Sequence, residues 1–290
     1  MLTIDAVLPV TISDAPRARI LLRSLGRFFQ GLGTCWVMAP DQELGQVREA
    51  LSGTGTSLQV LPDSELVPEL GSGKFGAAKS GKPYLRGWMI PQLAKIGIAA
   101  RVQGDFYLTL AADVLCTRPV RAGDLIIGDR ALATVLDEKS AAADAVHRWY
   151  QDAGHVLGLP VPKRFHGVCP ALVSTEGMLR MQEYLARRSL WSGARRREGA
   201  WRRYLIRHQP WTEHALYGTF LDAMGLFDRY HLDGGPAAFY GNCVWEEADL
   251  PRWDPARSFA PDAPGGFSVV QSNAGITADG LWKLVSGFLA

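Results

Sequence analysis

The first sixty residues alternate between short apolar runs and amphipathic runs, and this alternation limits the possible folds more than any other feature. The apolar, β-branched runs lie at 4–10, 34–38 and 57–61, and the helical patterns follow Asp14 and span 42–51. In the first helical pattern, Leu21, Leu25 and Phe28 recur at i, i+4 and i+7, which places one apolar stripe against a sheet. A βαβαβ succession predicts an α/β fold with a mostly parallel sheet and helices on both faces.

Strand and helix patterns continue along the chain, without an internal repeat. Strands are expected at 106–110, 131–136, 168–173, 238–245 and 267–271. Helices are expected over 140–153, from Ser174 or Thr175 towards Arg187, from Thr212 to Met224 and over 279–289. Because no linker interrupts this succession, we predict one domain over residues 1–290.

The composition is that of a soluble globular protein: 47% of the residues are hydrophobic, 21% are charged, and the net charge is +2. The apolar runs are much shorter than the ~20 residues of a membrane-spanning helix. The N-terminus lacks the basic region of a signal peptide, which predicts a cytoplasmic protein. Cys35, Cys116, Cys169 and Cys243 form no CxxC pair, so we expect reduced and mostly buried thiols rather than a zinc or disulfide framework.

Acidic side chains follow several of the expected strands. Asp14 and Asp41 come after the first two, and Asp113 comes after the run 106–110. Ligands of open α/β sheets bind outside the carboxyl ends of the strands, so these positions predict a ligand site. Each carboxylate is also a good helix or turn cap, which is the structural alternative.

A basic, glycine-rich segment at 62–86 interrupts the alternation and contains two incomplete phosphate-binding patterns. The run 71–76 satisfies GxGxxG, but it neither follows a strand nor opens a helix. The run 76–82 satisfies GxxxxGK, but Pro83 stands where a hydroxyl residue should ligate magnesium. We interpret the segment either as a lysine-bearing loop that closes over a diphosphate or as a solvated linker.

Three short motifs point to a known class of proteins. They are Gly87, Trp88, Gln92 and Lys95 on a helix, Ala111 and Asp113 after the strand, and Thr212 to Gly218 with Tyr230 and His231. Together they resemble GT-A-type glycosyltransferases, and specifically a bacterial group of uncharacterised glycosyltransferase-like proteins. The group's Asp-x-Asp is matched only at its second position, because Ala111 replaces the first acid.

The resemblance implies a glycosyltransferase that moves a sugar from a UDP- or GDP-type donor to a glycan, lipid-linked or secondary-metabolite acceptor. The nucleotide-binding half would be residues 1–137, and the acceptor-facing half would be 138–290. The implied donor-binding residues are Pro9, Asp14, Asp41, Trp88, Lys95 and Asp113. Lys95 would reach the phosphates or pair with Asp113.

The chemistry of glycosyl transfer suggests further roles. A divalent cation, manganese or magnesium, would bind Asp113, with His231 as a second ligand. Glu213 is the first candidate for the base that takes the acceptor's proton, and His214 is the second. Ordinary alternatives are a helix-start acid for Glu213, a core side chain for Trp88 and a structural imidazole for His231.

The segment Arg187 to Arg207 combines many arginines with aromatic residues. If helical, it suits an anionic membrane surface or a phosphate-bearing acceptor, and a solvated basic face is the alternative. The balanced charge elsewhere argues against nucleic acid as a partner. Two rival functions stay open: a nucleotidyltransferase, although Val10 to Ala15 lacks the expected glycines, and an inactive nucleotide-sugar-binding protein, which Ala111 allows.

Overall fold

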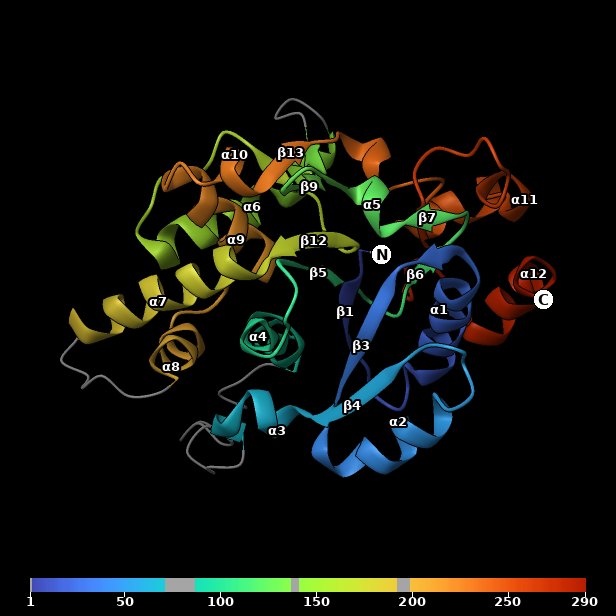
Figure 1. Ribbon diagram of the computed structural model, residues 1–290, viewed down its shortest axis with the longest axis horizontal. Coiled ribbons are helices and arrows are strands. Elements are labelled where there is room, and N and C mark those ends of the chain that lie inside the picture. The colour runs from blue at the N-terminus through green and yellow to red at the C-terminus, as the bar shows by residue number, and fades with distance from the viewer. Residues whose placement is uncertain (1, 71–86, 137–140, 192–198) are drawn as a thin grey trace.

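The computed structural model describes residues 2–70, 87–136, 141–191 and 199–290. Its centre is a five-stranded sheet in the order β12, β5, β1, β3, β4 (Figure 1). These strands are β1 (Ile4–Pro9), β3 (Leu32–Ala39), β4 (Leu58–Pro62), β5 (Phe106–Thr109) and β12 (Ala171–Ser174). The first four are parallel to one another, and β12 runs antiparallel to β5. The predicted mostly parallel sheet is confirmed.

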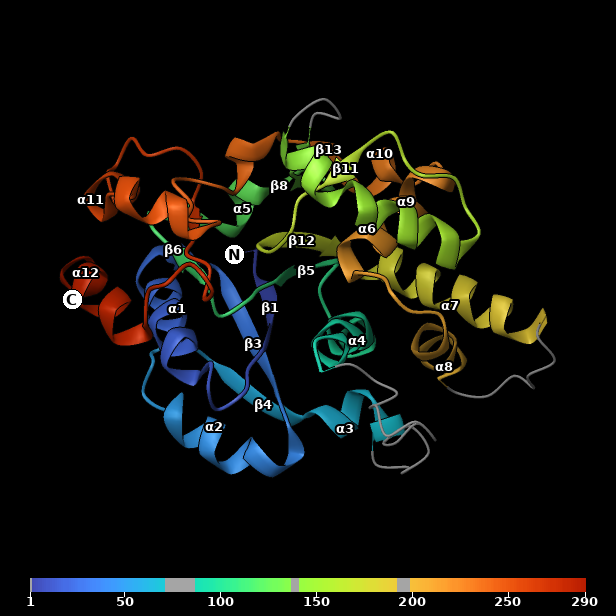
Figure 2. The same cartoon turned by 180° about the vertical axis from the view of Figure 1, so that it is seen from behind.

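Helices cover both faces of this sheet, as predicted (Figures 1 and 2). On one side lie α1 (Ala15–Phe28), α2 (Leu44–Ala50) and α12 (Ala278–Leu289). On the other side lie α4 (Met89–Gly97), α7 (Thr175–Trp191) and α8 (Ala200–Arg207). The remaining helices include α3 (Asp63–Leu66), α5 (Ala122–Leu125), α6 (Ala141–Leu157), α9 (Glu213–Ala223), α10 (Phe227–Tyr230) and α11 (Pro255–Ser258).

Short strands outside the central sheet form small additional sheets. One contains β13 (His231–Asp233), β9 (Arg130–Ala133) and β8 (Ile126–Ile127), and another pairs β10 (Val135–Leu136) with β11 (Phe165–His166). Two more pair β14 (Phe267–Val269) with β6 (Val114–Cys116), and β2 (Phe29–Gln30) with β7 (Val120–Arg121). The strand expected at 131–136 is therefore two strands, β9 and β10, with different partners.

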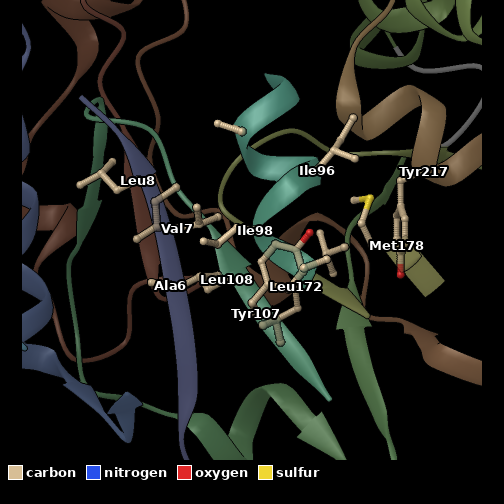
Figure 3. Packing of buried hydrophobic residues seen from close by; sticks show 14 of the residues in the cluster. Ala6, Val7, Leu8, Ile96, Ile98, Tyr107, Leu108, Leu172, Met178 and Tyr217 are labelled. Carbon is tan, nitrogen blue, oxygen red and sulfur yellow. The ribbon is translucent and has the colours of Figure 1, made fainter. Parts of the chain in front are cut away.

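The main hydrophobic core joins the central sheet to the helices that carry the candidate site. Figure 3 shows Val7 of β1 and Leu108 of β5 on one side of α4, and Met178 of α7 and Tyr217 of α9 on the other side, towards which Ile96 of α4 points. All five side chains are buried. Burying such side chains contributes about 1.5–3 kcal/mol each, so α4 and α9 are held firmly against the sheet.

A smaller core lies beneath α12. Ile20 of α1 and Leu115 of β6 pack there against Leu281 and Val285. The apolar spacing of α12 thus explains how this helix docks on α1. No helix in the described ranges combines the length and the apolar character that crossing a bilayer requires.

Two local predictions differ from the structure. Residues 238–245 form no strand; only two isolated bridges join Tyr240 to Phe267 and Val244 to Val270. Asp14 stands at the start of α1 but does not cap it, because its carboxylate accepts hydrogen bonds from the N–H and hydroxyl of Thr11. The cap predicted at Thr212 is confirmed, since its hydroxyl accepts a bond from the N–H of Ala215.

Candidate active site

Two cavities adjoin at the carboxyl ends of the parallel strands, and Pro91 lines both of them. The larger has a volume of about 650 Å³, and its walls include Trp88, Ala111, Asp113, Cys169, Glu213 and His214. The smaller has a volume of about 580 Å³, and its walls include Pro9, Thr11, Asp14, Asp41, Asp63 and Ser64. Because β12 is antiparallel to β5, Cys169 before β12 lies at the same edge as the residues after β5.

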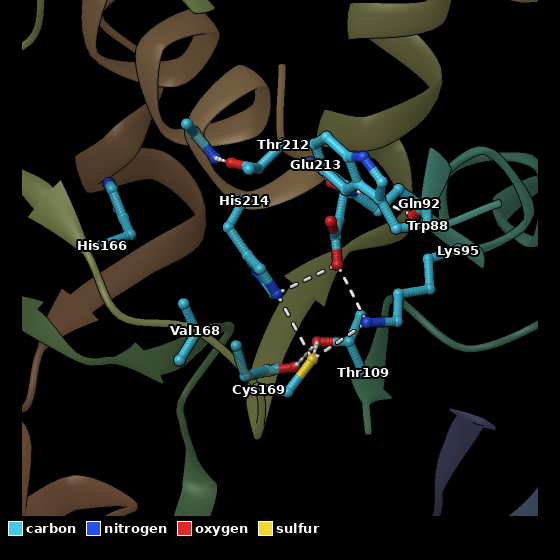
Figure 4. Close-up of polar contacts among 12 residues, drawn as sticks. Trp88, Gln92, Lys95, Thr109, His166, Val168, Cys169, Thr212, Glu213 and His214 are labelled. Carbon is cyan, nitrogen blue, oxygen red and sulfur yellow. Dashed lines mark hydrogen bonds and ion pairs between the residues drawn. The ribbon is translucent and has the colours of Figure 1, made fainter. Parts of the chain in front are cut away.

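Four ionisable side chains form a buried cluster in the larger cavity, which we call the ion cluster: Lys95, Cys169, Glu213 and His214 (Figure 4). The Lys95 ammonium lies 2.9 Å from a Glu213 carboxylate oxygen and 3.1 Å from the Cys169 sulfur. The Nε2 atom of His214 lies 3.1 Å from that same oxygen and 3.3 Å from the sulfur. Each cationic group thus touches both acidic groups.

Local structure explains how these side chains meet. Trp88, Gln92 and Lys95 are spaced i, i+4 and i+7, which puts them along one face of α4. The Gln92 amide donates to the Trp88 carbonyl and its oxygen accepts a 3.0 Å bond from the Glu213 N–H. Together with the Thr212 cap, this bond satisfies N–H groups that a helix start leaves unpaired. The motif residues of α4 therefore hold the first turn of α9 in place.

The charges of the ion cluster balance one another. Burial alone would lower the pKa of Lys95, but Cys169 and Glu213 raise it above its usual range. Burial would raise the pKa of Glu213, but Lys95 and His214 hold it far below the usual range. Likewise, burial would lower the pKa of His214, and the two acids raise it to about 10. Near neutral pH the cluster holds two cations and one carboxylate, and Cys169 supplies a second anion where its thiol is ionised.

Cys169 is the group in the cluster whose protonation changes near neutral pH. Burial would raise the pKa of its thiol, but the positive charges of Lys95 and His214 lower it to about 7. By contrast, burial raises the pKa of Cys35 to about 12. From the sequence, all four cysteines were expected to be ordinary buried thiols. The spacing of the cysteines does not distinguish Cys169, because its partners lie on other elements, α4 and α9.

This geometry changes the roles predicted for Glu213 and Lys95. The Glu213 carboxylate already accepts from two cations, so it is a weak base in this arrangement. His214 carries a proton near neutral pH and is first of all a donor. Lys95 was expected to reach the phosphates or to pair with Asp113; its buried ammonium pairs with Glu213 and not with Asp113.

Asp113 faces the larger cavity from the end of β5 and already has a cationic partner. Its carboxylate lies 3.8 Å from a guanidinium nitrogen of Arg17, which also donates to the carbonyls of Val270 and Ile276. Burial raises the pKa of Asp113, against the lowering effects of hydrogen bonds from Ser272 and of Arg17. Arg17 therefore compensates the negative charge of Asp113, which the sequence analysis expected a metal ion to neutralise. The sequence analysis did not identify Arg17.

His231 does not share a cavity with Asp113. Its ring is buried beside Phe106 and Phe227, and its Nε2 atom bonds the Tyr217 hydroxyl at 2.8 Å. The predicted pair of Asp113 and His231 does not fit a divalent cation, because one ligand is already engaged in the core and the other faces an arginine. His231 has the structural role that was the alternative.

Three donor atoms of the ion cluster, from Cys169, Glu213 and His214, lie within 4.8 Å of one another, a spacing that a metal ion could bridge. However, the Lys95 ammonium bonds both acidic groups, and its charge opposes a further cation at that point. The cluster is complete as an ionic assembly without a metal.

The smaller cavity collects the acids that follow β1, β3 and β4. Asp41 accepts hydrogen bonds from the N–H and the hydroxyl of Ser64, which fixes its carboxylate at the cavity wall. Burial, with the nearby charges of Asp41 and Glu43, raises the pKa of Asp63 to about 6. The predicted residues Pro9, Asp14 and Asp41 are thus brought together here, while Trp88, Lys95, Asp113, Glu213 and His214 meet in the larger cavity.

Several described arginines of the basic segment have partners within the protein. Arg187 pairs with Glu183 in α7, and both Arg202 and Arg203 pair with Glu69. Arg195 to Arg197, and the incomplete phosphate-binding patterns with their lysines, lie outside the described residues. Contact with a membrane or with a phosphate-bearing acceptor stays a prediction.

Solved structures with the same fold are GT-A glycosyltransferases. The mouse xyloside xylosyltransferase 1, in its apo form, has a TM-score of 0.50 and 12% identity over 95% of this chain and 100% of its own. The galactosyltransferase LgtC, in complex with donor and acceptor sugar analogues, has a TM-score of 0.52 and 12% identity over 98% of this chain and 96% of its own. An active-site mutant of LgtC gives a TM-score of 0.51 with the same identity and coverage.

At this identity the likeness establishes the fold, which is that of GT-A glycosyltransferases. At the level of sequence, residues 1–290 match the family described as "Family of unknown function (DUF6492)", and the protein belongs to that family. No curated protein matches the sequence.

Proposed function

We propose that this protein transfers a sugar from a nucleoside-diphosphate donor of the UDP or GDP type to an acceptor hydroxyl. The observation that carries this proposal is the pair of adjoining cavities that share Pro91 at the carboxyl edge of a GT-A-type sheet. One cavity has acidic walls, and the other contains the ion cluster and Asp113. Such a division suits a ligand with a nucleoside at one end and a reactive sugar at the other.

The nucleoside is assigned to the smaller cavity. Its carboxylates are hydrogen-bond acceptors, and the N–H groups of uracil or guanine and the ribose hydroxyls are donors that match them. Asp41 is prepared for this role, because Ser64 holds its side chain in place before any ligand arrives. Pro9 and Asp14 form the part of the wall that follows β1.

The donor sugar and the acceptor are assigned to the larger cavity. Trp88, Trp149 and Trp245 are exposed there, and aromatic faces of this kind pack against the apolar face of a sugar ring. Lys95 and His214 provide positive charge where the leaving diphosphate gains negative charge. Glu213 holds both cationic groups in position rather than taking the first proton.

A divalent cation, manganese or magnesium, is assigned to the nucleotide rather than to a site built by Asp113 and His231. Magnesium commonly binds substrate phosphates and keeps several of its waters, so it needs few protein ligands. When bound, such an ion would neutralise the diphosphate. Arg17 already neutralises Asp113, which allows a diphosphate to approach that carboxylate.

The test is a thermal-shift and calorimetric screen of UDP, GDP and their hexose derivatives, followed by chromatography of the products. A ligand that binds only the folded state must raise the melting temperature. We expect binding of one nucleoside diphosphate, slow release of that diphosphate from its sugar, and weaker binding after Asp41→Asn. Asp262→Asn, at an exposed residue outside both cavities, is the matched control.

The products separate the rival functions. Release of pyrophosphate from a nucleoside triphosphate and a sugar phosphate would indicate a nucleotidyltransferase. Binding of a nucleotide sugar without any release or transfer, across a broad set of acceptors, would indicate an inactive binding protein. No binding by any nucleoside diphosphate at millimolar concentration would reject the proposal altogether.

A further inference from the structure

Cys169 lies between the two cations of the ion cluster. Its sulfur is 3.1 Å from the Lys95 ammonium and 3.3 Å from the His214 Nε2 atom. When protonated, the sulfur donates to the Thr109 hydroxyl oxygen at 3.8 Å, and that hydroxyl donates its own hydrogen to the Ala171 carbonyl at 3.0 Å. Tyr240, whose pKa burial holds well above its usual range, also faces this thiol and stays neutral. The charged neighbours of the sulfur are therefore Lys95, His214 and, beyond them, Glu213.

The hydrogen-bond roles in this arrangement favour a thiolate. An ammonium group only donates, so the sulfur must accept from Lys95. The Nε2 atom of His214 faces two acceptors, the sulfur and a Glu213 oxygen, and so it carries a hydrogen. The Lys95 ammonium and the N–H of His214, which the sulfur shares with Glu213, both stabilise the anionic form of the sulfur, which is the nucleophilic form of cysteine.

The sulfur is also placed where a ligand can meet it. Cys169 lines the larger cavity, and Figure 4 shows its side chain directed towards Lys95 and His214 at the cavity wall. Cys35 and Cys116 are fully buried and line neither of the two adjoining cavities. The protein thus places one cysteine sulfur beside two cationic groups at a cavity wall, and the same chain supplies fully buried thiols for comparison.

We propose that Cys169 is a nucleophile that forms a covalent bond with an electrophilic carbon bound in the larger cavity. The inference rests on the proposed function for the identity of that carbon, which is the anomeric carbon of the donor sugar. The sulfur–carbon bond forms as the bond from that carbon to the diphosphate oxygen breaks, and both electrons of the broken bond leave with the nucleoside diphosphate. The product on the protein is a thioglycoside.

His214 completes the second displacement. Loss of the thiolate removes one of the two anions that keep His214 protonated, and the imidazolium then releases its proton to solvent. As the acceptor oxygen attacks the anomeric carbon, neutral His214 takes the hydroxyl proton, and the sulfur–carbon electrons return to sulfur. The thiolate and the imidazolium are both restored, and two successive inversions retain the anomeric configuration.

The first experiment needs no nucleotide. Folded protein is treated with iodoacetamide in EDTA between about pH 5 and pH 9, and each cysteine is followed by peptide mass spectrometry. We expect alkylation of Cys169 to level off above about pH 7 and, near pH 6, to be ~10-fold or more faster than that of an ordinary thiol. Lys95→Met should move the midpoint to higher pH, with circular dichroism checking that the variant folds.

The second experiment incubates the protein with UDP- and GDP-hexoses and no acceptor. We expect one hexosyl mass added to Cys169, its removal when an acceptor is supplied, and loss of diphosphate release by ~100-fold or more in Cys169→Ser. Equal diphosphate release by wild type and Cys169→Ser, without an adduct, would overturn the nucleophile and leave the proposed function standing. An ordinary thiol pH profile, or protection of Cys169 from iodoacetamide at pH 8, would also overturn it.

A thiolate profile in the first experiment with no donor consumed in the second would have a different meaning. It would retain Cys169 as a nucleophile towards simple electrophiles and reject the glycosyl step at Cys169, while the acceptor screen described above decides the proposed function separately.

Discussion

The side-chain oxygen of Gln92 accepts a 3.0 Å hydrogen bond from the backbone N–H of Glu213. These residues are 121 positions apart in the chain, and their bond ties a buried face of α4 to the start of α9. It forms at the point where Lys95 and Glu213 also meet, so one contact between two helices supports both the backbone and the charges of the site.

Gln92→Leu should therefore destabilise the protein and disturb the ion cluster. The substitution leaves the buried N–H of Glu213 without a partner, which costs about 1–3 kcal/mol. We expect a lower midpoint of urea unfolding together with a higher pH midpoint for alkylation of Cys169. Gln151→Leu, at an exposed position of α6, is the control and should change stability by less than about 0.5 kcal/mol. Equal effects of the two variants would contradict the supporting role of Gln92.

The pH dependence of stability should reveal two opposing titrations. The Cys169 thiol has a pKa of about 7 in the folded protein against 9.0 for a free thiol. Between these values the unfolded chain holds more protons, so stability rises with pH. His214 has a folded pKa of about 10 against 6.5. It contributes stability below pH 6.5 that is lost as the pH rises through about 10.

In the wild type the two trends nearly cancel between pH 7 and pH 9. Cys169→Ser removes the rising one, so its free energy of unfolding should fall with pH across this window, as measured by urea titration at each pH. Cys243→Ser is the control, because burial raises the pKa of that thiol to about 11. Cys243 therefore stays protonated in the folded protein across this window, and its removal takes away no contribution that rises with pH. Parallel pH profiles for wild type and Cys169→Ser would contradict the assigned charges.

Manganese should bind the protein appreciably only in the presence of a nucleoside diphosphate. Arg17 compensates Asp113, and His231 is engaged with Tyr217, so the free protein offers no pair of ligands there. Electron paramagnetic resonance of free Mn²⁺, with and without UDP or GDP, measures this directly. Tight binding of Mn²⁺ to the free protein that disappears in Asp113→Asn would instead restore Asp113 as a resident metal ligand.

Trp88 is expected to contribute to ligand binding and little to folding. Its side chain is 46% exposed at the wall of the larger cavity. Trp88→Ala should change stability by less than about 1 kcal/mol while weakening binding of a nucleotide sugar more than binding of the nucleotide alone. Calorimetry with both ligands gives the comparison. A large loss of stability would return Trp88 to the core role that the sequence also allowed.

The first strands and helices of the fold could be predicted from the sequence, because each of their patterns arises from the burial of nearby side chains. The apolar runs of β1 and β3 and the stripe of α1 report burial directly. Residues 238–245 were wrongly expected to form a strand, because this apolar segment makes only two isolated bridges, Tyr240 with Phe267 of β14 and Val244 with Val270 just after β14. An apolar run shows that a segment is buried, but it does not show that the segment pairs along its length.

The sequence predicted those parts of the site whose residues lie on one helix or at its start. Gln92 and Lys95 share a helix face, and Thr212 caps the helix that Glu213 begins, so their proximity follows from local geometry. Cys169 and Arg17 have no such signal, because their importance arises from partners on other elements. Charge compensation across the fold is a property of three-dimensional packing, and a single sequence does not encode it in its spacing.

The antiparallel pairing of β12 with β5 fixes the position of the Cys169 sulfur. Ala171 lies opposite Thr109, and the Thr109 hydroxyl bonds the Ala171 carbonyl. A shift of one residue in this register would turn every side chain of β12 to the opposite face. The distance from the sulfur to its two cations is thus fixed by strand pairing, and Pro170, the one residue between Cys169 and that register point, should tolerate substitution far better than an insertion or deletion beside it.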